Sequence, residues 1–312
     1  MKPVRRLMAI AAIAAALPAL AVAVFHVLDR AYPLPAIGPG EVSAEVVDRD
    51  GALLRPFATA DGRWRLAVSL NDIDPQLIAM LVAYEDKRFY DHTGVDPLAL
   101  LRASMQLVSN GRIVSGGSTL TMQLARLTMP PGGRSLPRKV QQMFRAIQIE
   151  RRFSKADILQ RYLTLAPYGG NLEGVRAASL AYFGKEPKKL LLSEAALLVA
   201  LPQSPEARRP DRRLHAAKAA RDRVLQRMAD AGIIDRLEIA RAAAAPLTGT
   251  RRDLPALAPH LADAAVRQNP HQTRIRLTVH TDIPQALEKP AQSAPQRIGS
   301  RLPVAPVLAH SG

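Results

Sequence analysis

Residues 84–96 read YEDKRFYDHTGVD, a short stretch that brings together charged residues, aromatic rings and a histidine. A helix is predicted just before them, because Asp74 is a good N-cap and the proline after it suits the first helical position. The apolar face of that helix passes through Ile78 and Leu81, and Glu85 continues the same face. We therefore expect Glu85 to be partly desolvated, a setting that suits a general acid or base.

The charged neighbours of Glu85 are expected to support it. Asp86 lies one step round the helix, so its carboxylate should point elsewhere and cap or brace the turn. Lys87, Arg88 and His92 can supply counter-charges, and the aromatic rings should pack the turn. The alternative is a salt-bridged helix end with a carboxylate at its rim, since structural ion pairs perturb acids in the same way.

Two further stretches are rich in donors and positive charge. Residues 116–126 read GGSTLTMQLAR, and small hydroxyl residues after glycines suit a phosphate-like anion, although such runs are also common in loops. Residues 134–152 read RSLPRKVQQMFRAIQIERR and hold six basic residues and one acid. The core stripe predicted for this helix consists of Val140, Met143, Phe144 and Ile147. Its other face, with Arg138, Gln142 and Arg145, is either a solvated basic face or a cationic clamp on a diphosphate.

The chain has 312 residues, a formal net charge of +16 and no cysteine. The positive charge favours an anionic partner: nucleic acid, an acidic membrane surface or a phosphorylated substrate. Residues 7–28 carry no Asp, Glu, Lys or Arg and are long enough to cross a bilayer as a helix. Arg5 and Arg6 precede them, so a single-pass anchor with a cytoplasmic N-terminus is predicted, with a cleaved signal peptide as the alternative. Either reading places the rest outside the cytoplasm and argues against nucleic acid.

Four parts are predicted along the chain. They are a cytoplasmic tip and transmembrane anchor (1–28), a stalk and small β region (29–70), a helical main domain (71–250), and the start of a linker with a disordered end (251–312). Asp50-Gly51 and Asp61-Gly62 between alternating residues predict a β meander. Helices are predicted over 193–201, 212–230 and 235–244, with Gly232 as a C-cap, and a strand over 273–282. The fold class is therefore mainly α.

Five stretches, in this order, resemble the peptidoglycan glycosyltransferase (transglycosylase) domain of class A penicillin-binding proteins. They are YEDKRFYDHTGVD, GGSTLTMQLAR, RSLPRKVQQ, KADILQRYL with YGGNLEGVRAAS and YFGK, and SEAALLVALPQSP, within residues 75–210. GGSTLTMQ and APYGGNLEG are most similar to the 1C subgroup. The resemblance implies a lysozyme-like glycosyltransferase domain over residues 71–250, on the periplasmic side of the bacterial inner membrane.

Such a domain polymerises lipid II into glycan strands in cell wall biosynthesis, inverting the donor carbon and releasing undecaprenyl diphosphate. The resemblance implies that Glu85 is the general base that deprotonates the acceptor sugar hydroxyl. It also implies a substrate- and diphosphate-binding set of Ser118, Thr119, Gln123, Arg126, Arg134, Arg138 and Lys139, supported by Asp86, His92 and Gln142. We expect no metal site in the protein and no tightly bound cofactor, with Mg²⁺ only as a companion of the diphosphate. The expected partners are lipid II, the growing glycan strand, inner-membrane lipids and other cell wall synthases, and not nucleic acid.

The chain departs from the family's pattern at several positions. Gln142 stands where the family usually has a second glutamate, Gln141 where a lysine is frequent, and Thr164 where an asparagine is usual. Without the second carboxylate, Glu85 is the only plausible base, and the case for a protein-bound Mg²⁺ is weaker. Ser-x-x-Lys occurs nowhere in the 312 residues, so no transpeptidase activity is expected.

Two other functions are also compatible with the sequence. A catalytically weakened scaffold that binds lipid II is motivated by Gln142 and Thr164. A lytic, glycan-cleaving enzyme would also suit a lone glutamate on a lysozyme-like fold, but it has no need of a cationic cluster.

Overall fold

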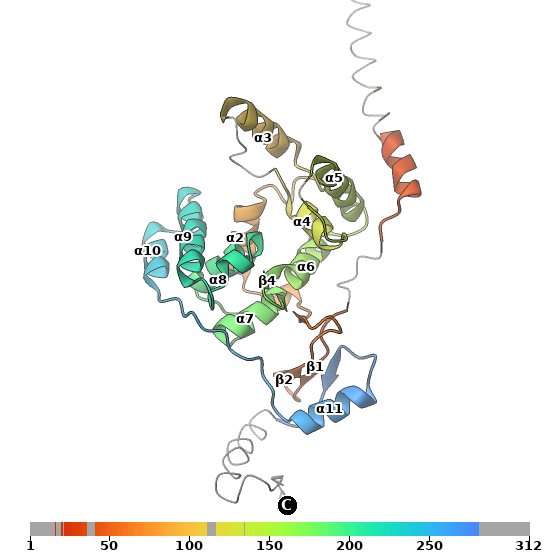
Figure 1. Ribbon diagram of the computed structural model, residues 1–312. Helices are drawn as coiled ribbons and strands as arrows, with labels where there is room; N and C mark the ends of the chain where they lie inside the picture. The colour runs from red at the N-terminus through yellow and green to blue at the C-terminus, as the bar shows by residue number, and fades with distance from the viewer. Residues whose placement is uncertain are drawn as a thin grey trace, which may run out of the picture. The chain divides into compact units, whose positions relative to one another are not determined.

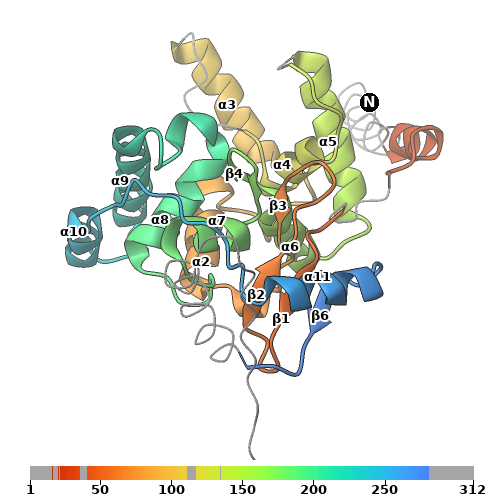
Figure 2. The same cartoon turned by 60° about the horizontal axis from the view of Figure 1, so that its bottom comes forward.

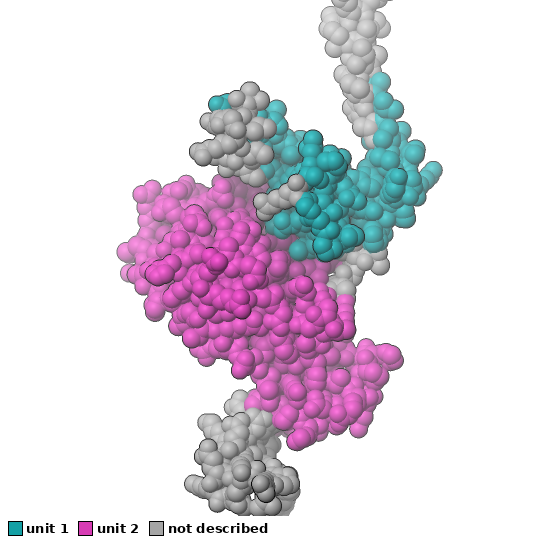
Figure 3. Space-filling view, viewed as in Figure 1, with its two compact units in different colours: residues 1–38, 92–154 teal, residues 39–91, 155–312 magenta. Residues whose placement is uncertain are grey.

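The computed structural model describes residues 16, 20, 22–35, 41–110, 117–133 and 135–280. The chain divides into two compact units, residues 1–38 with 92–154 (unit 1) and residues 39–91 with 155–312 (unit 2) (Figure 3). Most of the predicted anchor over 7–28 lies outside the described residues, as do Arg134 and the predicted tail after Pro284. Among the described residues, no helix combines the length and the apolar character needed to cross a membrane.

Unit 2 is built mainly from helices (Figure 1). They are α2 (Pro75–Glu85), α6 (Lys155–Leu165), α7 (Val175–Phe183), α8 (Leu192–Ala200), α9 (Leu214–Asp230), α10 (Arg236–Ala244) and α11 (Pro259–Gln268), with 3₁₀ turns η1 (Leu70–Asp72), η2 (Leu201–Gln203) and η3 (Glu206–Arg208). Every residue of α8 from Ala195 to Ala200 is buried, and α2 and α9 pack against it. A helix apolar on all sides is stable only when others surround it. The mainly α class and the helices predicted near α8, α9 and α10 are confirmed.

Asp74 joins the start of α2 to the segment that precedes α8. One carboxylate oxygen accepts the N–H of Gln76 at 2.9 Å, and Pro75 follows at the first helical position. The other oxygen accepts the N–H of Leu190 at 2.9 Å. The predicted N-cap is confirmed, and it also fixes α2 against the chain that leads into the buried helix.

The ends of α9 and α10 are closed in two different ways. Gly232 has φ 66°, and the N–H of Ile233 donates to the carbonyl of Met228 at 3.0 Å, which is a Schellman ending for α9. At the end of α10, the fully buried guanidinium of Arg221 donates to the carbonyls of Ala243 and Ala245 at 2.7 and 2.8 Å. The predicted role of Gly232 is confirmed.

Unit 2 also contains two small sheets. The first has the order β2-β1-β6, from β2 (Leu53–Pro56), β1 (Glu45–Val47) and β6 (Arg274–Arg276), with β1 antiparallel to β2 and parallel to β6. The second has the order β3-β5-β4, from β3 (Trp64–Arg65), β5 (Leu172–Glu173) and β4 (Pro167–Gly169). The predicted meander is therefore wrong in its pairing. Within residues 41–70, β1 and β2 form a hairpin, but β3 pairs in parallel with β5 and not with its neighbour in sequence (Figure 2).

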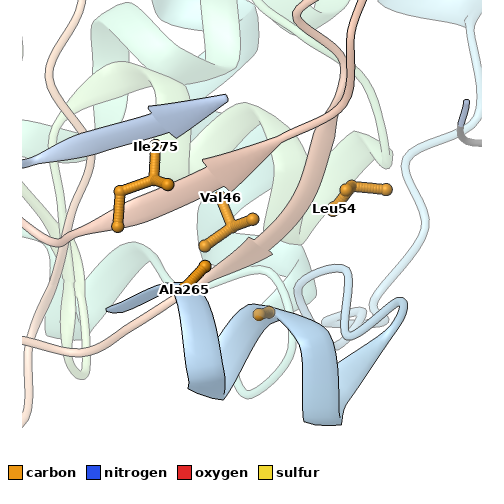
Figure 4. Packing of buried hydrophobic residues seen from close by; sticks show 5 residues of the cluster. Val46, Leu54, Ala265 and Ile275 are labelled. Atoms are coloured by element: carbon orange, nitrogen blue, oxygen red, sulfur yellow. The ribbon is translucent and has the colours of Figure 1, made fainter. Parts of the chain in front are cut away.

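The first sheet has its own hydrophobic core against α11. Val46, Leu54 and Ile275 from the strands meet Ala262 and Ala265 of the helix (Figure 4). The small alanines allow the helix to approach the sheet closely. Part of the predicted strand over 273–282 is present as β6, which joins this sheet by pairing with β1, far away along the chain.

Unit 1 is helical and contains the residues of two of the quoted stretches. Its helices are α3 (Pro97–Asn110), α4 (Leu120–Leu127) and α5 (Leu136–Glu150), together with a helix over residues 22–31, called the 22–31 helix below. α4 packs against α5. The buried residues of α5 are Ala146, Gln148 and Ile149.

The core stripe predicted for α5 is wrong. Val140 is 57% exposed, and Met143, Phe144 and Ile147 are only half-buried. The side of α5 that faces the core is set instead by the turn at Gly94, where φ is 101° and an added Cβ would lie 2.7 Å from the carbonyl of Ala146. This close approach selects the small Ala146 for the interior and turns the larger apolar side chains away from it.

A buried ion network ties β1 to α7 in unit 2. Arg176 donates to Glu45 on β1 and, at 2.7 and 2.9 Å, to both oxygens of Glu186. The side chains of Arg176 and Glu45 are 7% and 6% exposed. Burial by itself lowers the pKa of Arg176, but the hydrogen bonds and charges of Glu186 and Glu45 raise it above its usual value.

Arg176→Met is expected to lower the free energy of unfolding by about 3 kcal/mol, because the buried Glu45 then keeps, among the described residues, only Arg274 as an ion-pair partner, at 3.5 Å and half-exposed. Lys188→Met is the control, since Lys188 and Asp72 lie 3.8 Å apart with side chains 64% and 59% exposed. Its loss should cost less than about 1 kcal/mol. Urea denaturation of the detergent-solubilised chain measures both, and equal effects would contradict the importance of the buried network.

Candidate functional site

Glu85 is the last residue of α2, and its side chain is half-buried. The Nε2 group of Gln203, in η2, donates to its Oε1 at 2.7 Å. Arg208 in turn donates to Oε1 of Gln203 at 3.1 Å and to the carbonyl of Ala200 at 2.6 Å. The carboxylate is thus oriented by a side-chain amide, and that amide is itself oriented by a guanidinium anchored on the end of α8.

The neighbours of Glu85 fix the end of α2. Asp86 is buried and forms the C-cap, with its N–H donating to the carbonyl of Val82 at 2.9 Å. The guanidinium of Arg227, on α9, lies over the ring of Tyr84 at 4.8 Å and donates to its carbonyl at 3.3 Å. These contacts hold the backbone at the end of α2, and the role expected for the Asp86 carboxylate stays a prediction.

The aromatic residues of the quoted stretch separate into two environments. Phe89 is fully buried, with the ammonium of Lys155 at 4.6 Å from its ring centre. Tyr90 is 61% exposed. The expectation that the rings pack the turn therefore holds for Phe89 and not for Tyr90.

In unit 1, Thr119 and His92 hold the turn at Gly94. Thr119 is buried and caps α4 by accepting the N–H of Met122 at 3.1 Å, and it donates to the carbonyl of Gly94 at 2.6 Å. Nδ1 of His92 accepts the N–H of Gly94 at 3.1 Å, so the proton of the neutral ring lies on Nε2. Both side chains therefore have a structural role in this turn, and the substrate-binding role expected for Thr119 stays a prediction.

Lys139, Ser118 and Arg126 form the cation cluster of unit 1. The ammonium of Lys139 donates to the hydroxyl of Ser118. Burial, and then the positive charge of Arg126, lower the pKa of Lys139, and no carboxylate in the described part of the chain offsets them. The two cations, Lys139 and Arg126, favour the binding of an anion. A bound negative charge would offset both the burial of the ammonium and its repulsion by Arg126.

Arg138 lies one residue before Lys139, in the first turns of α5. Its guanidinium donates to the carbonyl of Pro130. It also lines an open hollow of about 670 Å³ with Gly133, Ser135, Pro137 and Gln141. Ser135 caps α5 by accepting the N–H of Arg138, so the positive end of the helix dipole faces the same region.

Two later residues of the same helix, Arg145 and Gln148, bind the N-terminal stretch of unit 1. Arg145 donates to the carbonyls of Tyr32 and Pro33 at 3.0 and 2.9 Å. Gln148 is 1% exposed and donates to Asp29 at 2.5 Å. The charged face predicted from the sequence is therefore divided, and Arg145 belongs to the helix junction rather than to a clamp.

Gln123 and Gln142 are half-exposed on α4 and α5, and Arg134 lies outside the described residues. Sequence reasoning did not single out Gln203 as a site residue, although it belongs to the quoted LPQSP segment; a polar residue directly after a wholly apolar helix was the available signal. Within the described part of the chain, no group of three or more His, Asp or Glu side chains is arranged to hold a metal ion.

Comparisons with known proteins agree on one family. A family model described as Transglycosylase matches residues 50–229. Penicillin-binding protein 1C of Escherichia coli (strain K12) is 40% identical over 282 residues, which cover 90% of this chain and 36% of the relative. Penicillin-binding protein 1A of Vibrio cholerae serotype O1 is 38% identical over 203 residues, covering 65% and 24%.

Among solved structures, penicillin-binding protein 1A from Haemophilus influenzae is 20% identical, with a TM-score of 0.39 over 84% of this chain and 31% of the other. The chain spans about a third or less of the length of these relatives.

The affinity of the detergent-solubilised chain for inorganic diphosphate is expected to fall as the pH rises through the lowered pKa of Lys139. Because the pKa of Lys139 is lowered, its ammonium loses the proton at a lower pH than an ordinary lysine, at about 10.4, would. Lys139→Arg keeps its charge, so its affinity should be retained to higher pH. Calorimetric titrations at several pH values compare the two proteins, and the comparison cancels the titration of diphosphate itself. Superimposable pH profiles would contradict a role for the Lys139 charge.

Proposed function

The chain belongs to the transglycosylase family, and we propose that it is a peptidoglycan glycosyltransferase that polymerises lipid II and releases undecaprenyl diphosphate. The observation that carries the proposal is the cation cluster of Lys139, Arg126 and Ser118, which no carboxylate of the described residues neutralises and which lies within the matched residues 50–229. A leaving diphosphate supplies the negative charge that such a cluster lacks. A lytic enzyme has no diphosphate to stabilise, so the cluster favours glycosyl transfer.

In the proposed reaction, Glu85 removes the proton from the acceptor sugar hydroxyl. The hydroxyl oxygen forms the new bond to the anomeric carbon of the donor as the bond from that carbon to the diphosphate oxygen breaks. Gln203 holds the carboxylate of Glu85 in position, and its own orientation depends on Arg208. Arg126, Arg138 and Lys139 stabilise the charge that develops on the leaving group, because fixed cations act most strongly where charge appears in the transition state.

Mg²⁺ is proposed only as a companion of the diphosphate. Gln142 carries no charge and offers a single amide oxygen where a second carboxylate would be a better ligand for a hard cation. We therefore assign the neutralisation of the leaving group to the arginines and the lysine of unit 1.

We place the protein at the bacterial inner membrane, with residues 7–28 as a single-pass anchor and the remainder on the periplasmic side. Leu98, Leu101 and Met105 of α3 are 59%, 52% and 61% exposed, and such a patch suits contact with lipid. The partners that this proposal includes are lipid II, the growing glycan strand, inner-membrane lipids and other cell wall synthases.

Glu85→Gln is expected to abolish polymerisation of labelled lipid II, a loss of at least about a hundredfold, because it removes the base and leaves the size of the side chain unchanged. Gln203→Leu removes only one hydrogen bond to a charged group, so a smaller loss of roughly tenfold is expected. Circular dichroism checks that both variants are folded. Near-normal turnover by Glu85→Gln would remove Glu85 as the base.

Arg138→Ala is expected to slow polymerisation by about a hundred- to a thousandfold, the usual effect of losing one charge-assisted contact to a developing anion. Arg223→Ala is the matched control, because Arg223 is exposed on α9 and distant in sequence from the cation cluster. It should leave the rate unchanged. Equal activities of the two variants, measured on the same lipid II, would mean that Arg138 belongs to a solvated face.

A further inference from the structure

An apolar groove runs between the 22–31 helix and α5 in unit 1. It encloses about 490 Å³ and is lined by Leu28 and Tyr32 on one side and by Val140, Phe144 and Ile147 on the other. None of the described residues that line it is acidic. Val140 is 57% exposed and Tyr32 is 61% exposed, so the groove is open along the first half of α5.

The groove is the uncovered part of the stripe that sequence periodicity assigns to the core. Near its far end, the ring of Phe25 packs on Phe144 with centres 5.4 Å apart. Beyond that contact, Gln148 and Arg145 tie the two segments together through the carbonyl of Tyr32, at 3.0 Å from each donor. The junction is therefore closed at one end, and the apolar surface before it has nothing packed on it within the described residues.

The charged group in the groove is already satisfied. The guanidinium of Arg145 is directed to the carbonyls of Tyr32 and Pro33 and to Oε1 of Gln148, at 3.0, 2.9 and 2.8 Å. It contributes to the joint and places no unpaired charge among the apolar side chains. A hydrocarbon ligand can therefore enter without removing a charge from its partners, which would be costly.

The groove continues into the polar hollow at the start of α5. Pro137 and Gln141 line both of them. Arg138 lines the hollow, and Lys139 with Ser118 lies one residue further along the helix. From Arg138 to Phe144 the helix rises by about 9 Å, so an anionic site and an apolar site share about two turns of one helix.

We infer that this groove binds the first isoprene units of a polyprenyl diphosphate whose head lies in the hollow. The inference rests on the proposed function for the identity of the head group, and it adds a separate site for the tail. An ordinary bilayer lipid is the less suitable occupant, because cations directly adjoining the groove select a ligand with concentrated negative charge next to its hydrocarbon. The tail site would hold the donor lipid beside the 22–31 helix while the sugar is transferred from its diphosphate to the acceptor.

The test is a series of binding measurements on the full chain in one detergent, with inorganic diphosphate, geranyl diphosphate and farnesyl diphosphate as probes. The affinity is expected to rise with each isoprene unit. Val140→Ser and Leu28→Ser should each reduce the affinity for farnesyl diphosphate by about tenfold or more, since they remove two and three carbons and each buried carbon that is lost costs roughly fourfold. Both should bind inorganic diphosphate as the unchanged protein does. Leu237→Ser, at a position 60% exposed on α10, is the matched control and should change nothing.

Two results would overturn the tail site. One is an advantage of farnesyl diphosphate that persists in both groove variants. The other is equally tight binding of lauroyl lysophosphatidic acid, which would mean that the groove accepts any anionic lipid. Failure of the proposed function has a different signature: the chain would not polymerise lipid II, yet the diphosphate series would still discriminate by tail length and respond to Val140→Ser.

Discussion

Burial of α8 is the constraint on which the placement of Glu85 depends. From Ala195 to Ala200 every side chain of this helix is buried, so α2 and α9 must pack around it. The last carbonyl of α8, at Ala200, accepts a hydrogen bond from Arg208, and Gln203 follows in the next turn. The amide that holds Glu85 is thereby positioned by the core of unit 2. Glu85 itself ends a helix whose start, at Asp74, is bonded to the segment preceding α8.

In unit 1, α5 has an analogous importance, and its charges serve two ends. Arg138 and Lys139 stand at the N-terminal end, where the helix dipole also favours an anion. Arg145 and Gln148 hold the N-terminal stretch at the other end. The basic residues of this helix therefore have two roles: those at its start form an anion site, and Arg145 belongs to a structural joint. The apolar stripe between them can stay uncovered because Ala146 and Ile149, on another face, supply the core.

Features that depend on a few neighbouring residues could be predicted from the sequence. The cap at Asp74, the ending of α9 at Gly232 and the burial of α8 are of this kind, because each follows from local chemistry or composition. The pairing of β3 with β5 could not be predicted, because the two strands are far apart along the chain. Each strand also contributes only two residues to the pairing, which is too short for a recognisable pattern.

The candidate site divides along the same line. Glu85 and the basic residues of α5 stand out as residue types, but nothing local to Gln203 tells that it reaches Glu85. The periodicity of the sequence shows that Val140, Met143, Phe144 and Ile147 share one face of α5. It does not show whether that face is buried in the core. The turn at Gly94 decides that, and it acts through a backbone contact at Ala146 that no hydrophobic pattern records.

Gln142 links the electrostatics of unit 1 to the choice of ligand. On a helix, position 142 neighbours Arg138 four residues before it and Lys139 three residues before it. A glutamate there would neutralise one of the two cations and raise the pKa of Lys139; a glutamine does neither. The cost of burying Lys139 next to Arg126 therefore remains in the unliganded protein and lowers its pKa. A bound diphosphate removes that cost, so the cluster gains most from a ligand with concentrated negative charge and gains least from a neutral sugar. Since the apolar groove begins at the same turns of α5, the ligand that satisfies both surfaces is one that joins a diphosphate directly to a hydrocarbon chain.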